Sequence, residues 1–275
     1  MFEIRESKSS FFVCFEVYGV RLKVSCFSEG LMREIDDNLE FIFPVGLSGS
    51  KGTRIERKIS VRTSKNFRYV LFEGRKKLTY SNDKNPFINY FFGYLRRIVA
   101  EFAKSFVFLH AGVVGWKGKA LILPGRSFGG KTTLVRELTK LGAKYYSDEY
   151  AVLDEAGLVH PFPKTLSVRG IVDDYQQVEL PVEEFGGEKG VEPLAVGMIL
   201  LTEYEQGAVW APRYVNGGFG VLELLSHTIP IRYDPKFSLK VLNKTANRAI
   251  IVKSKRGEAS DFALKLLSFF EKKAL

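Results

Sequence analysis

The sequence is poor in cysteine and in long apolar runs. It holds 2 cysteines, Cys14 and Cys26, among 275 residues and no CxxC pair, which argues against a disulfide framework and a cysteine zinc site. Its most apolar region, 86–114, is interrupted by charges such as Arg96 and Arg97, so no membrane span is expected. Charged residues precede any hydrophobic run at the N-terminus, unlike in a signal peptide. These features predict a cytoplasmic protein with reduced thiols.

Charge is plentiful but unevenly spread. The net charge is +10, and residues 51–77 hold ten Lys or Arg against Glu56 and Glu73. Residues 171–205 are acidic, with nine carboxylates and only Lys189. No DNA-binding motif and no regular aromatic platform accompany the basic stretch, so a nucleic-acid partner is not expected. The basic stretch is interpreted as a solvated face and as a candidate docking surface.

The order of apolar patterns predicts two parts, a smaller β-rich N-terminal module over 1–105 and a nucleotide-binding catalytic domain over 106–275. Expected strands in the first part are 11–18 and 21–26, joined as a hairpin at Gly19, followed by 41–43, 58–61 and 69–72. The module ends in a helix over 88–102, with Phe91, Leu95, Ile98 and Phe102 at helical spacing. A further amphipathic helix over 258–271 is expected to pack through Phe262, Leu266, Phe269 and Phe270.

One motif dominates the second part. Residues 125–132 read Gly125-Arg126-Ser127-Phe128-Gly129-Gly130-Lys131-Thr132, which fits the phosphate-binding loop G-x-x-x-x-G-K-[ST]. The apolar run 120–123 before it is of strand type and ends at Pro124. After it, Leu134, Leu138 and Leu141 recur at helical spacing until Gly142. The motif and its context predict a nucleotide-binding protein.

Each residue type in the loop has a physical role. Glycines let main-chain N–H groups approach phosphate oxygens, and the helix that follows directs its unpaired N–H groups at the same anion. Lys131 is expected to reach the β- and γ-phosphates of ATP, and the Thr132 hydroxyl to hold Mg²⁺. Thr133 is expected to bind the nucleotide together with residues 125–132. ATP and Mg²⁺ are therefore the expected cofactors.

Phosphoryl transfer also needs a base near the γ-phosphate, and two segments offer one. The apolar strand 106–111 contains His110. Residues 145–150 place Asp148 and Glu149 after a short apolar strand, where ligands lie in an α/β sheet. A histidine in an apolar strand is more often a buried core residue, whereas the carboxylate pair is typical of a base or Mg²⁺ ligand at this position.

These segments together resemble a known family. Residues 109–114, the loop at 125–132, 147–149 and 168–170 follow one another as in the catalytic domain of HPr kinase/phosphorylase and its smaller HPr kinase-related cousins. The separations of 21 residues from His110 to Lys131 and of 18 from Lys131 to Glu149 fit that pattern without gaps. The resemblance implies an α/β fold with the mixed-sheet nucleotide core that the family shares with phosphoenolpyruvate carboxykinase. It also implies that a ring-like homo-oligomer could form.

The resemblance further implies roles for single residues. His110 would orient the reacting groups and assist proton transfer. The second carboxylate of the pair, Glu149, would take the proton from the acceptor hydroxyl, with Asp148 as its substitute or as a metal ligand. Arg169 would steady the transferred charge, and Arg232 is a weaker candidate for the same role.

The chain departs from the family at Ser167, where the family has a metal-binding glutamate, and it lacks the family's arginine-rich C-terminal signature. A forward kinase therefore fits better than a phosphorylase. The leading hypothesis is a phosphotransferase that uses ATP and Mg²⁺ to phosphorylate a Ser or Thr hydroxyl of a protein or peptide. The alternatives are a kinase for a small, amino-acid-type hydroxyl compound and a non-enzymatic nucleotide-binding regulator.

Overall fold

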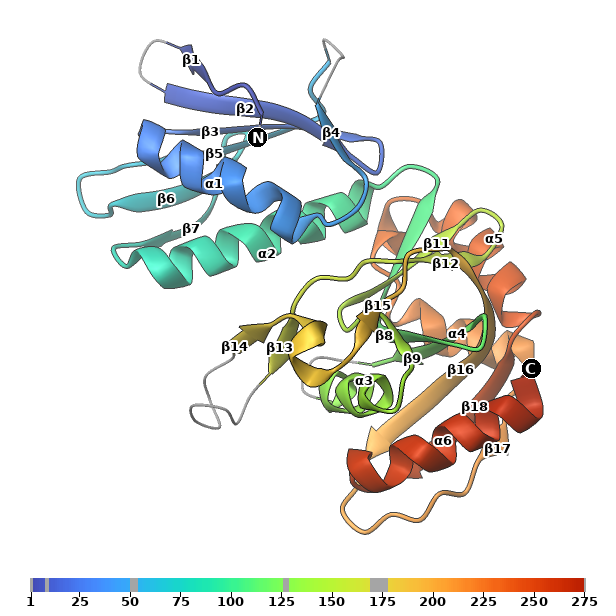
Figure 1. The fold of residues 1–275 in the computed structure, drawn as a ribbon. Coiled ribbons are helices and arrows are strands. Elements are labelled where there is room, and N and C mark those ends of the chain that lie inside the picture. The colour runs from blue at the N-terminus through green and yellow to red at the C-terminus, as the bar shows by residue number, and fades with distance from the viewer. Residues whose placement is uncertain (1, 8–9, 50–53, 126–128, 169–177, 275) are drawn as a thin grey trace. The chain divides into compact units, whose positions relative to one another are not determined.

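The computed structural model describes residues 2–7, 10–49, 54–125, 129–168 and 178–274. The chain divides into two compact units, Met1–Ser105 and Phe106–Leu275, which Figure 1 shows and which are described separately below. Each unit combines helices with a sheet that has both parallel and antiparallel neighbours. The protein is therefore of mixed α/β type, and the expectation of mixed sheets is confirmed.

The N-terminal unit is built on a sheet with strand order β1-β2-β3-β5-β6-β7, and β4 pairs with β2. The β3 and β5 strands run parallel, and the other neighbours are antiparallel. Its elements are β1 (Arg5–Ser7), β2 (Ser10–Val17), β3 (Val20–Cys26), α1 (Glu29–Ile42), β4 (Leu47–Gly49), β5 (Arg57–Arg62), β6 (Tyr69–Glu73), β7 (Lys76–Ser81) and α2 (Lys84–Phe102).

The predicted hairpin at Gly19 is confirmed. Strands β2 and β3 pair in antiparallel register out to Val17 and Val20, which leaves Tyr18 and Gly19 as the turn. Both turn residues have positive φ, 48° and 76°, as a tight two-residue hairpin turn requires. Val13, Val17 and the other alternate side chains of β2 are buried, because they face the helices, and those between them are partly exposed.

The strand predicted at 41–43 is wrong, because residues 41 and 42 are the last turn of helix α1. Leu31, Ile35, Leu39 and Ile42 are buried along one side of this helix. The Ser28 hydroxyl accepts a hydrogen bond from the Leu31 N–H and so caps its first turn. The apolar residues 41–43 thus lie at the end of a helical repeat of buried residues that starts at Leu31. In its described residues, the N-terminal unit therefore has two helices, and not only the one predicted at its end.

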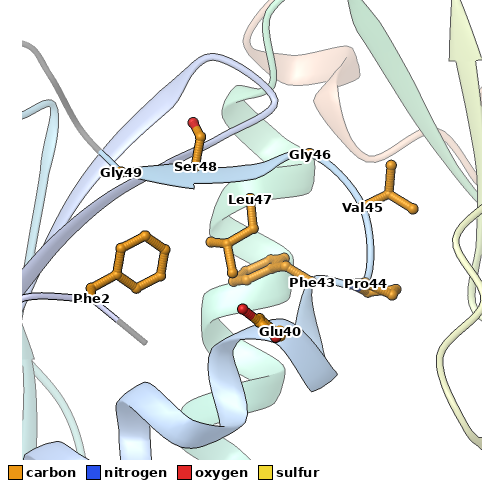
Figure 2. A pocket seen from close by; sticks show the side chains of 9 residues that line it. All are labelled: Phe2, Glu40, Phe43, Pro44, Val45, Gly46, Leu47, Ser48 and Gly49. Carbon is orange, nitrogen blue, oxygen red and sulfur yellow. The ribbon is translucent and has the colours of Figure 1, made fainter.

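Helix α2 covers the segment predicted as helical and begins four residues earlier, at Lys84. Asp83 caps it by accepting a hydrogen bond from the Asn85 N–H at 3.2 Å. Phe91, Leu95 and Ile98 are buried, as their spacing predicts. A cavity of about 450 Å³ lies near the end of α1, and Figure 2 shows the side chains around it. Among the described residues that line it Glu40 is the only charged one, so it lacks the grouped charges of a phosphoryl-transfer site.

The C-terminal unit holds the phosphate-loop segment. Its strands are β8 (Phe106–Trp116), β9 (Lys119–Pro124), β10 (Lys144–Ser147), β11 (Tyr150–Asp154), β12 (Leu158–His160), β13 (Leu166–Val168), β14 (Val178–Leu180), β15 (Glu188–Lys189), β16 (Leu194–Tyr204), β17 (Arg213–Tyr214) and β18 (Ile250–Arg256). Its helices are α3 (Lys131–Lys140), α4 (Gly217–Leu225), α5 (Pro235–Ala246) and α6 (Ala259–Ala274), with 3₁₀ turns η1 (Val182–Phe185) and η2 (Pro230–Arg232).

Two long strands organise this unit. Strand β8 pairs with β9, β10 and β11, and β16 pairs with β9, β12 and β18. Because β11 also pairs with β12, the hydrogen-bonded path through β8, β9, β16, β12 and β11 returns to β8. The separate ribbon β13–β14 pairs Ser167 with Glu179. This arrangement brings the ends of β9, β10 and β18 near the start of helix α3.

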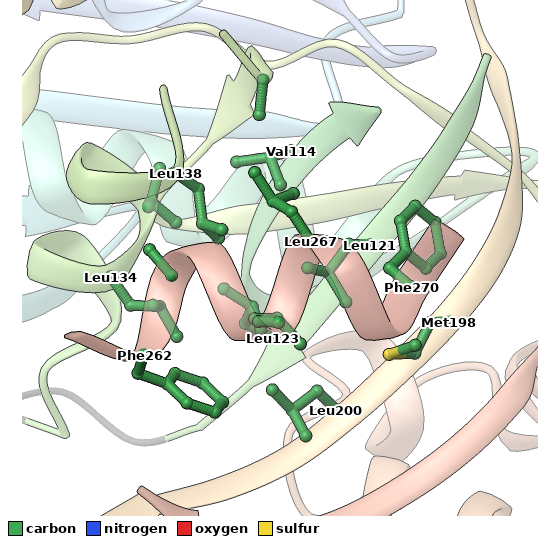
Figure 3. Close-up of a cluster of buried hydrophobic side chains, with 14 of the residues drawn as sticks. Val114, Leu121, Leu123, Leu134, Leu138, Met198, Leu200, Phe262, Leu267 and Phe270 are labelled. Carbon is green, nitrogen blue, oxygen red and sulfur yellow. The ribbon is translucent and has the colours of Figure 1, made fainter. Parts of the chain in front are cut away.

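Helices cover both faces of β9. Leu121 and Leu123 belong to a core formed with α3 and α6, where Leu134 lies near Phe262 at one end of α6 and Met198 lies near Phe270 at the other (Figure 3). The alternate residue, Ile122, belongs to a second core with α4 and α5. The packing role predicted for the C-terminal helix is confirmed, with Phe269 only partly buried against the same cluster. In the part of the chain that the structure describes, no helix is both long and apolar enough to cross a membrane.

Candidate functional site

The phosphate-loop segment joins the end of β9 to the start of α3. Pro124 is the last residue of the strand, and Lys131 is the first of the helix. Gly130 precedes the helix with φ of 73°, which a residue without Cβ adopts without strain. A Cβ atom there would lie 2.5 Å from Nη2 of Arg256, so the guanidinium would have to move to admit a side chain. Strand, glycine and helix thus follow one another as predicted, whereas Arg126, Ser127 and Phe128 lie outside the described residues.

Lys131 reaches back across the loop. Its Nζ donates a hydrogen bond to the Gly125 carbonyl at 2.9 Å. Partial burial lowers the pKa of Lys131 to about 8, against the opposing influence of the Asp148 carboxylate. The ammonium therefore keeps its proton at neutral pH while it is less hydrated than a surface lysine. Such a cation gains more from a phosphate than an exposed one does, because less water must be removed.

The carboxylate pair lies beside the loop, at the end of β10. Thr132 Oγ1 donates to Asp148 Oδ2 at 3.0 Å, and the Tyr145 hydroxyl donates to Asp148 Oδ1 at 3.1 Å. Both oxygens of the buried Asp148 therefore have a donor. Glu149 is less buried, and its N–H donates to Ser147 Oγ at 3.1 Å. The two carboxylates differ in environment: Asp148 is held against the first turn of α3, whereas more of Glu149 is accessible.

Lys164, which sequence reasoning missed, is the buried cation of the site. It is 8% exposed, and its Nζ lies 3.6 Å from Asp148 Oδ1, 3.8 Å from Glu149 Oε2 and 3.7 Å from Glu179 Oε2. The same ammonium donates to the Thr165 carbonyl at 2.9 Å. A buried ammonium at this distance offsets the repulsion between adjacent carboxylates. The only sequence signal for this residue is its position, as a single lysine between Pro163 and the short strand β13.

The ribbon β13–β14 adds a third carboxylate. Ser167 Oγ donates to Glu179 Oε1, and Thr165 Oγ1 donates to Glu179 Oε2 at 2.6 Å. Glu179 thus stands beside Ser167, the position at which the chain departs from the family pattern. Arg169, predicted to steady transferred charge, lies outside the described residues.

His110 lies on β8, between the loop and the carboxylate pair. Its carbonyl accepts from the Gly125 N–H at 3.3 Å, and its N–H donates to the His227 carbonyl at 2.8 Å. Burial and the Lys131 ammonium lower the pKa of His110 to about 4, although the Glu149 carboxylate opposes this. The imidazole is therefore neutral at physiological pH and can accept a proton or a hydrogen bond.

Arg256, at the end of β18, is a second functional candidate that sequence reasoning left without a role. It is 3% exposed, and its Nη2 donates to the Gly130 carbonyl at 3.0 Å and to the Gly129 carbonyl at 3.4 Å. Burial lowers the pKa of Arg256, an effect that Glu258 opposes. Because the Gly129 and Gly130 carbonyls are drawn toward Arg256, the N–H groups of the same peptide planes point the other way. Arg256 thereby fixes the orientation of these two peptide planes.

A cleft of about 1220 Å³ opens beside Lys131 and Arg256. Its described lining includes Leu123, Gly125, Gly129, Leu201, Thr202, Glu203, Tyr204, Val209, Arg213, Tyr214, Glu223, His227, Lys253 and Lys255. Arg232 is not among the described lining residues and is exposed on η2. The structure therefore gathers His110, Thr132, Asp148 and Glu149 near Lys131, with Arg232 elsewhere. Of these residues, only Lys131 is in the described lining of the cleft.

The donors suit Mg²⁺. The Thr132 hydroxyl and the Asp148 carboxylate present oxygen atoms 3.0 Å apart at the first turn of α3. Mg²⁺ prefers oxygen ligands, and it usually keeps waters and binds substrate phosphates in place of a full protein cage. The described part of the chain has no cluster of three His, Cys, Asp or Glu side chains that could enclose a metal.

Comparison with known proteins adds little. No protein-family model matches the sequence, and no curated protein sequence does. Among solved structures, the HPr(Ser) kinase/phosphatase from Coxiella burnetii is similar with a TM-score of 0.37 and 13% sequence identity. That similarity covers 60% of this chain and 94% of the other. A similarity this distant carries no argument about activity, which is argued below from the site.

Proposed function

We propose that the chain is a kinase with an HPr kinase-like nucleotide core, which uses ATP and Mg²⁺ to phosphorylate a Ser or Thr hydroxyl of a protein or peptide. The observation that carries this proposal is the hydrogen bond between Thr132 and Asp148. It joins the first turn after the phosphate loop to the carboxylate pair, so that phosphate binding and proton removal are available at one place. A cytoplasmic setting, with Cys14 and Cys26 as free thiols, suits an ATP-dependent enzyme.

The environments of the two carboxylates support different roles. Asp148 is buried and held by Thr132 and Tyr145, which suits a metal ligand. Glu149 is more accessible and suits the base that takes the proton from the acceptor hydroxyl. His110 is neutral, and its pKa is influenced by the charges of Lys131 and Glu149. Its imidazole would accept a hydrogen bond from the acceptor hydroxyl and orient it.

The phosphate groups of ATP would be bound by the N–H groups at the start of α3 and by the Lys131 ammonium. Thr132 and Asp148 would hold Mg²⁺, which when bound neutralises phosphate charge. Lys164 would keep Asp148 and Glu149 in position, since its ammonium lies within 4 Å of both carboxylates.

The size of the cleft supports a second bound molecule beside the nucleotide. Pockets for single small ligands usually have volumes of about 300–1,000 Å³, and this cleft, at about 1220 Å³, is larger. A Ser or Thr hydroxyl of a peptide is the proposed acceptor, and a free hydroxyl compound is the alternative.

The test is transfer of label from γ-labelled ATP in the presence of Mg²⁺, with a pool of Ser- and Thr-containing peptides and a pool of free hydroxyl metabolites. Label on a peptide is expected, and Lys131→Ala should lower the rate by roughly 10²–10³-fold, as when one charge-stabilising donor is lost. The control Lys140→Ala, at the exposed end of the same helix, should retain the rate. Label only on a metabolite would replace the peptide substrate, and ATP binding without any transfer would overturn the kinase.

A further inference from the structure

One face of the N-terminal sheet is not covered by α1 or α2. Side chains that alternate with the buried ones in β2, β3, β5, β6 and β7 lie on this helix-free face. The register places them in rows: Phe12 is opposite Ser25, Ser25 opposite Ser60, and Ser60 opposite Phe72. Lys23 is opposite Lys58, and Val70 lies between Arg62 and Tyr80.

Charge divides this unit into two sides. Helix α1 carries Glu29, Glu34, Asp36, Asp37 and Glu40 against Arg33 alone. The helix-free face instead carries Lys23, Lys58, Arg62 and Lys77, in addition to Arg21. None of the four has a carboxylate within 4 Å among the described residues, whereas Arg21 on the same face is near Glu16 and Glu56. The face therefore has positive charge that the unit itself does not neutralise.

Lys23 and Lys58 are placed where their like charges repel each other. They are direct partners in the parallel register of β3 and β5, on neighbouring strands about 4.8 Å apart. Like charges in directly opposed sheet positions destabilise a sheet. The Lys23–Lys58 pair therefore concentrates positive charge on this face without a carboxylate within 4 Å among the described residues.

Three of the cations lie over aromatic rings. Lys23 Nζ is 3.6 Å from the Phe12 ring centroid, the Arg62 guanidinium is 4.7 Å from that of Phe72, and Lys77 Nζ is 5.1 Å from that of Tyr80. Cation–π contacts of this kind hold the charges in place before a ligand arrives. They also cover the ring faces on which nucleic-acid bases would stack. The face thus presents fixed cations and favours carboxylates over bases.

We propose that the helix-free face of the N-terminal sheet, through Lys23, Lys58, Arg62 and Lys77, docks an acidic, extended segment of a polypeptide. Its carboxylates would neutralise the Lys23–Lys58 pair and bind Arg62 and Lys77 at the other end of the face. The proposal does not depend on phosphoryl transfer, because docking needs neither nucleotide nor the carboxylate pair of the C-terminal unit.

The test uses the full chain without nucleotide and a short fluorescein-labelled peptide of alternating Glu and Ser. Anisotropy at low salt should show saturable binding, and a peptide with Gln in place of Glu should not bind. The double variant Lys23→Glu/Lys58→Glu should weaken binding by about tenfold or more, since exposed ion pairs are exchanged for repulsion. The control Lys265→Glu/Lys272→Glu reverses the same number of exposed charges on α6 and should bind as the parent does.

A second double variant controls for misfolding. Lys23→Gln/Lys58→Gln removes the repulsion without adding charge, and it should weaken peptide binding while the thermal unfolding midpoint is kept or raised. Equal binding by the parent and this variant would overturn the proposal. Tighter binding of a short oligothymidylate than of the acidic peptide would overturn it as well, in favour of a single-stranded nucleic acid.

Discussion

The two units of this protein place their charges differently. The N-terminal unit has 19 Lys or Arg and 12 Asp or Glu, whereas the larger C-terminal unit has 22 and 19. Among the described residues, the N-terminal unit nevertheless buries only one charged side chain, Asp36, whose two carboxylate oxygens share the Phe2 N–H as a donor. The C-terminal unit buries Asp148, Lys164 and Arg256, all beside the phosphate loop.

The difference reflects the cost of desolvation. Removing an ion from water costs several kcal/mol even after the protein relaxes, whereas an exposed ion costs almost nothing. Buried charges gathered at one place are therefore typical of a site where fixed electrostatics act on a reacting group. Exposed cations on a sheet face are typical of recognition. The contrast between the two units supports the proposed chemistry in the C-terminal unit and the proposed docking on the N-terminal unit.

The largest expected effect separates the two carboxylates. Glu149→Gln should lower kcat by about 10²–10⁴-fold, because the base is lost, and should leave acidic-peptide binding by the N-terminal unit unchanged. Asp148→Asn should instead raise the Mg²⁺ concentration needed for half-maximal rate. Steady-state kinetics with Mg²⁺ titration distinguish the two variants. Full activity of Glu149→Gln with an inactive Asp148→Asn would exchange the two roles.

Removal of the buried cation tests the cost of buried charge directly. Lys164→Met leaves Asp148 and Glu149 next to each other without the ammonium and should lower the free energy of unfolding by about 3 kcal/mol at pH 7. Urea denaturation measures this, and Mg²⁺ should stabilise the variant more than the parent. The control Lys144→Met removes an exposed ion pair with Glu188 and should cost less than about 1 kcal/mol. Equal stability of Lys164→Met and the parent would contradict the idea that the buried charges of the C-terminal unit depend on each other for stability.

Acid should destabilise the C-terminal unit through His110. Its pKa is about 4 in the folded protein, against 6.5 for the ordinary histidine, so the unfolded chain takes up the proton first as pH falls. The stabilisation is complete above about pH 6.5 and declines toward pH 4, by about 3 kcal/mol in total. His110→Gln should reduce this dependence in urea denaturation over that range. Identical pH profiles for parent and variant would show that His110 is not buried in the neutral form.

The smallest expected effect is a change in stability caused by one lysine of the N-terminal sheet. Lys58→Gln relieves the repulsion from Lys23 and should raise the free energy of unfolding by about 0.3 kcal/mol. Lys76→Gln, at the exposed start of β7, should change it less. A thermal melt of each variant at low salt makes the comparison. A clear loss of stability in Lys58→Gln would mean that this lysine contributes structurally to the sheet.

Much of the local structure could be predicted from the sequence. The hairpin at Gly19, the strands at 58–61 and 69–72, and the strand and helix on either side of 125–132 all depend on residues close together in the chain. Helix α1 was predictable as well, because Ser28 and the spacing of Leu31, Ile35 and Leu39 are local signals. The short apolar triplet at 41–43 has equal preference for strand and helix, and the preceding turns decided between them.

The site was only partly predictable. The motif placed Lys131 and Thr132, and the strand order placed the carboxylate pair near them. Lys164 and Arg256 could not be assigned, since a lone lysine or arginine has the same local pattern on a surface as in a site. Arg256 contacts a loop residue 127 positions earlier, and no periodicity spans that distance.

What the amino-acid sequence alone determined is the set of short-range features: the phosphate loop, its flanking strand and helix, and the positions of the candidate acids and bases. Backbone preferences and apolar periodicity act over a few residues, so these features are present in the chain before it folds. Only the tertiary structure decided which charges are buried beside the loop and which lie over aromatic rings on a sheet face. Burial and opposed register depend on segments far apart in the chain, which come together only when the sheets form.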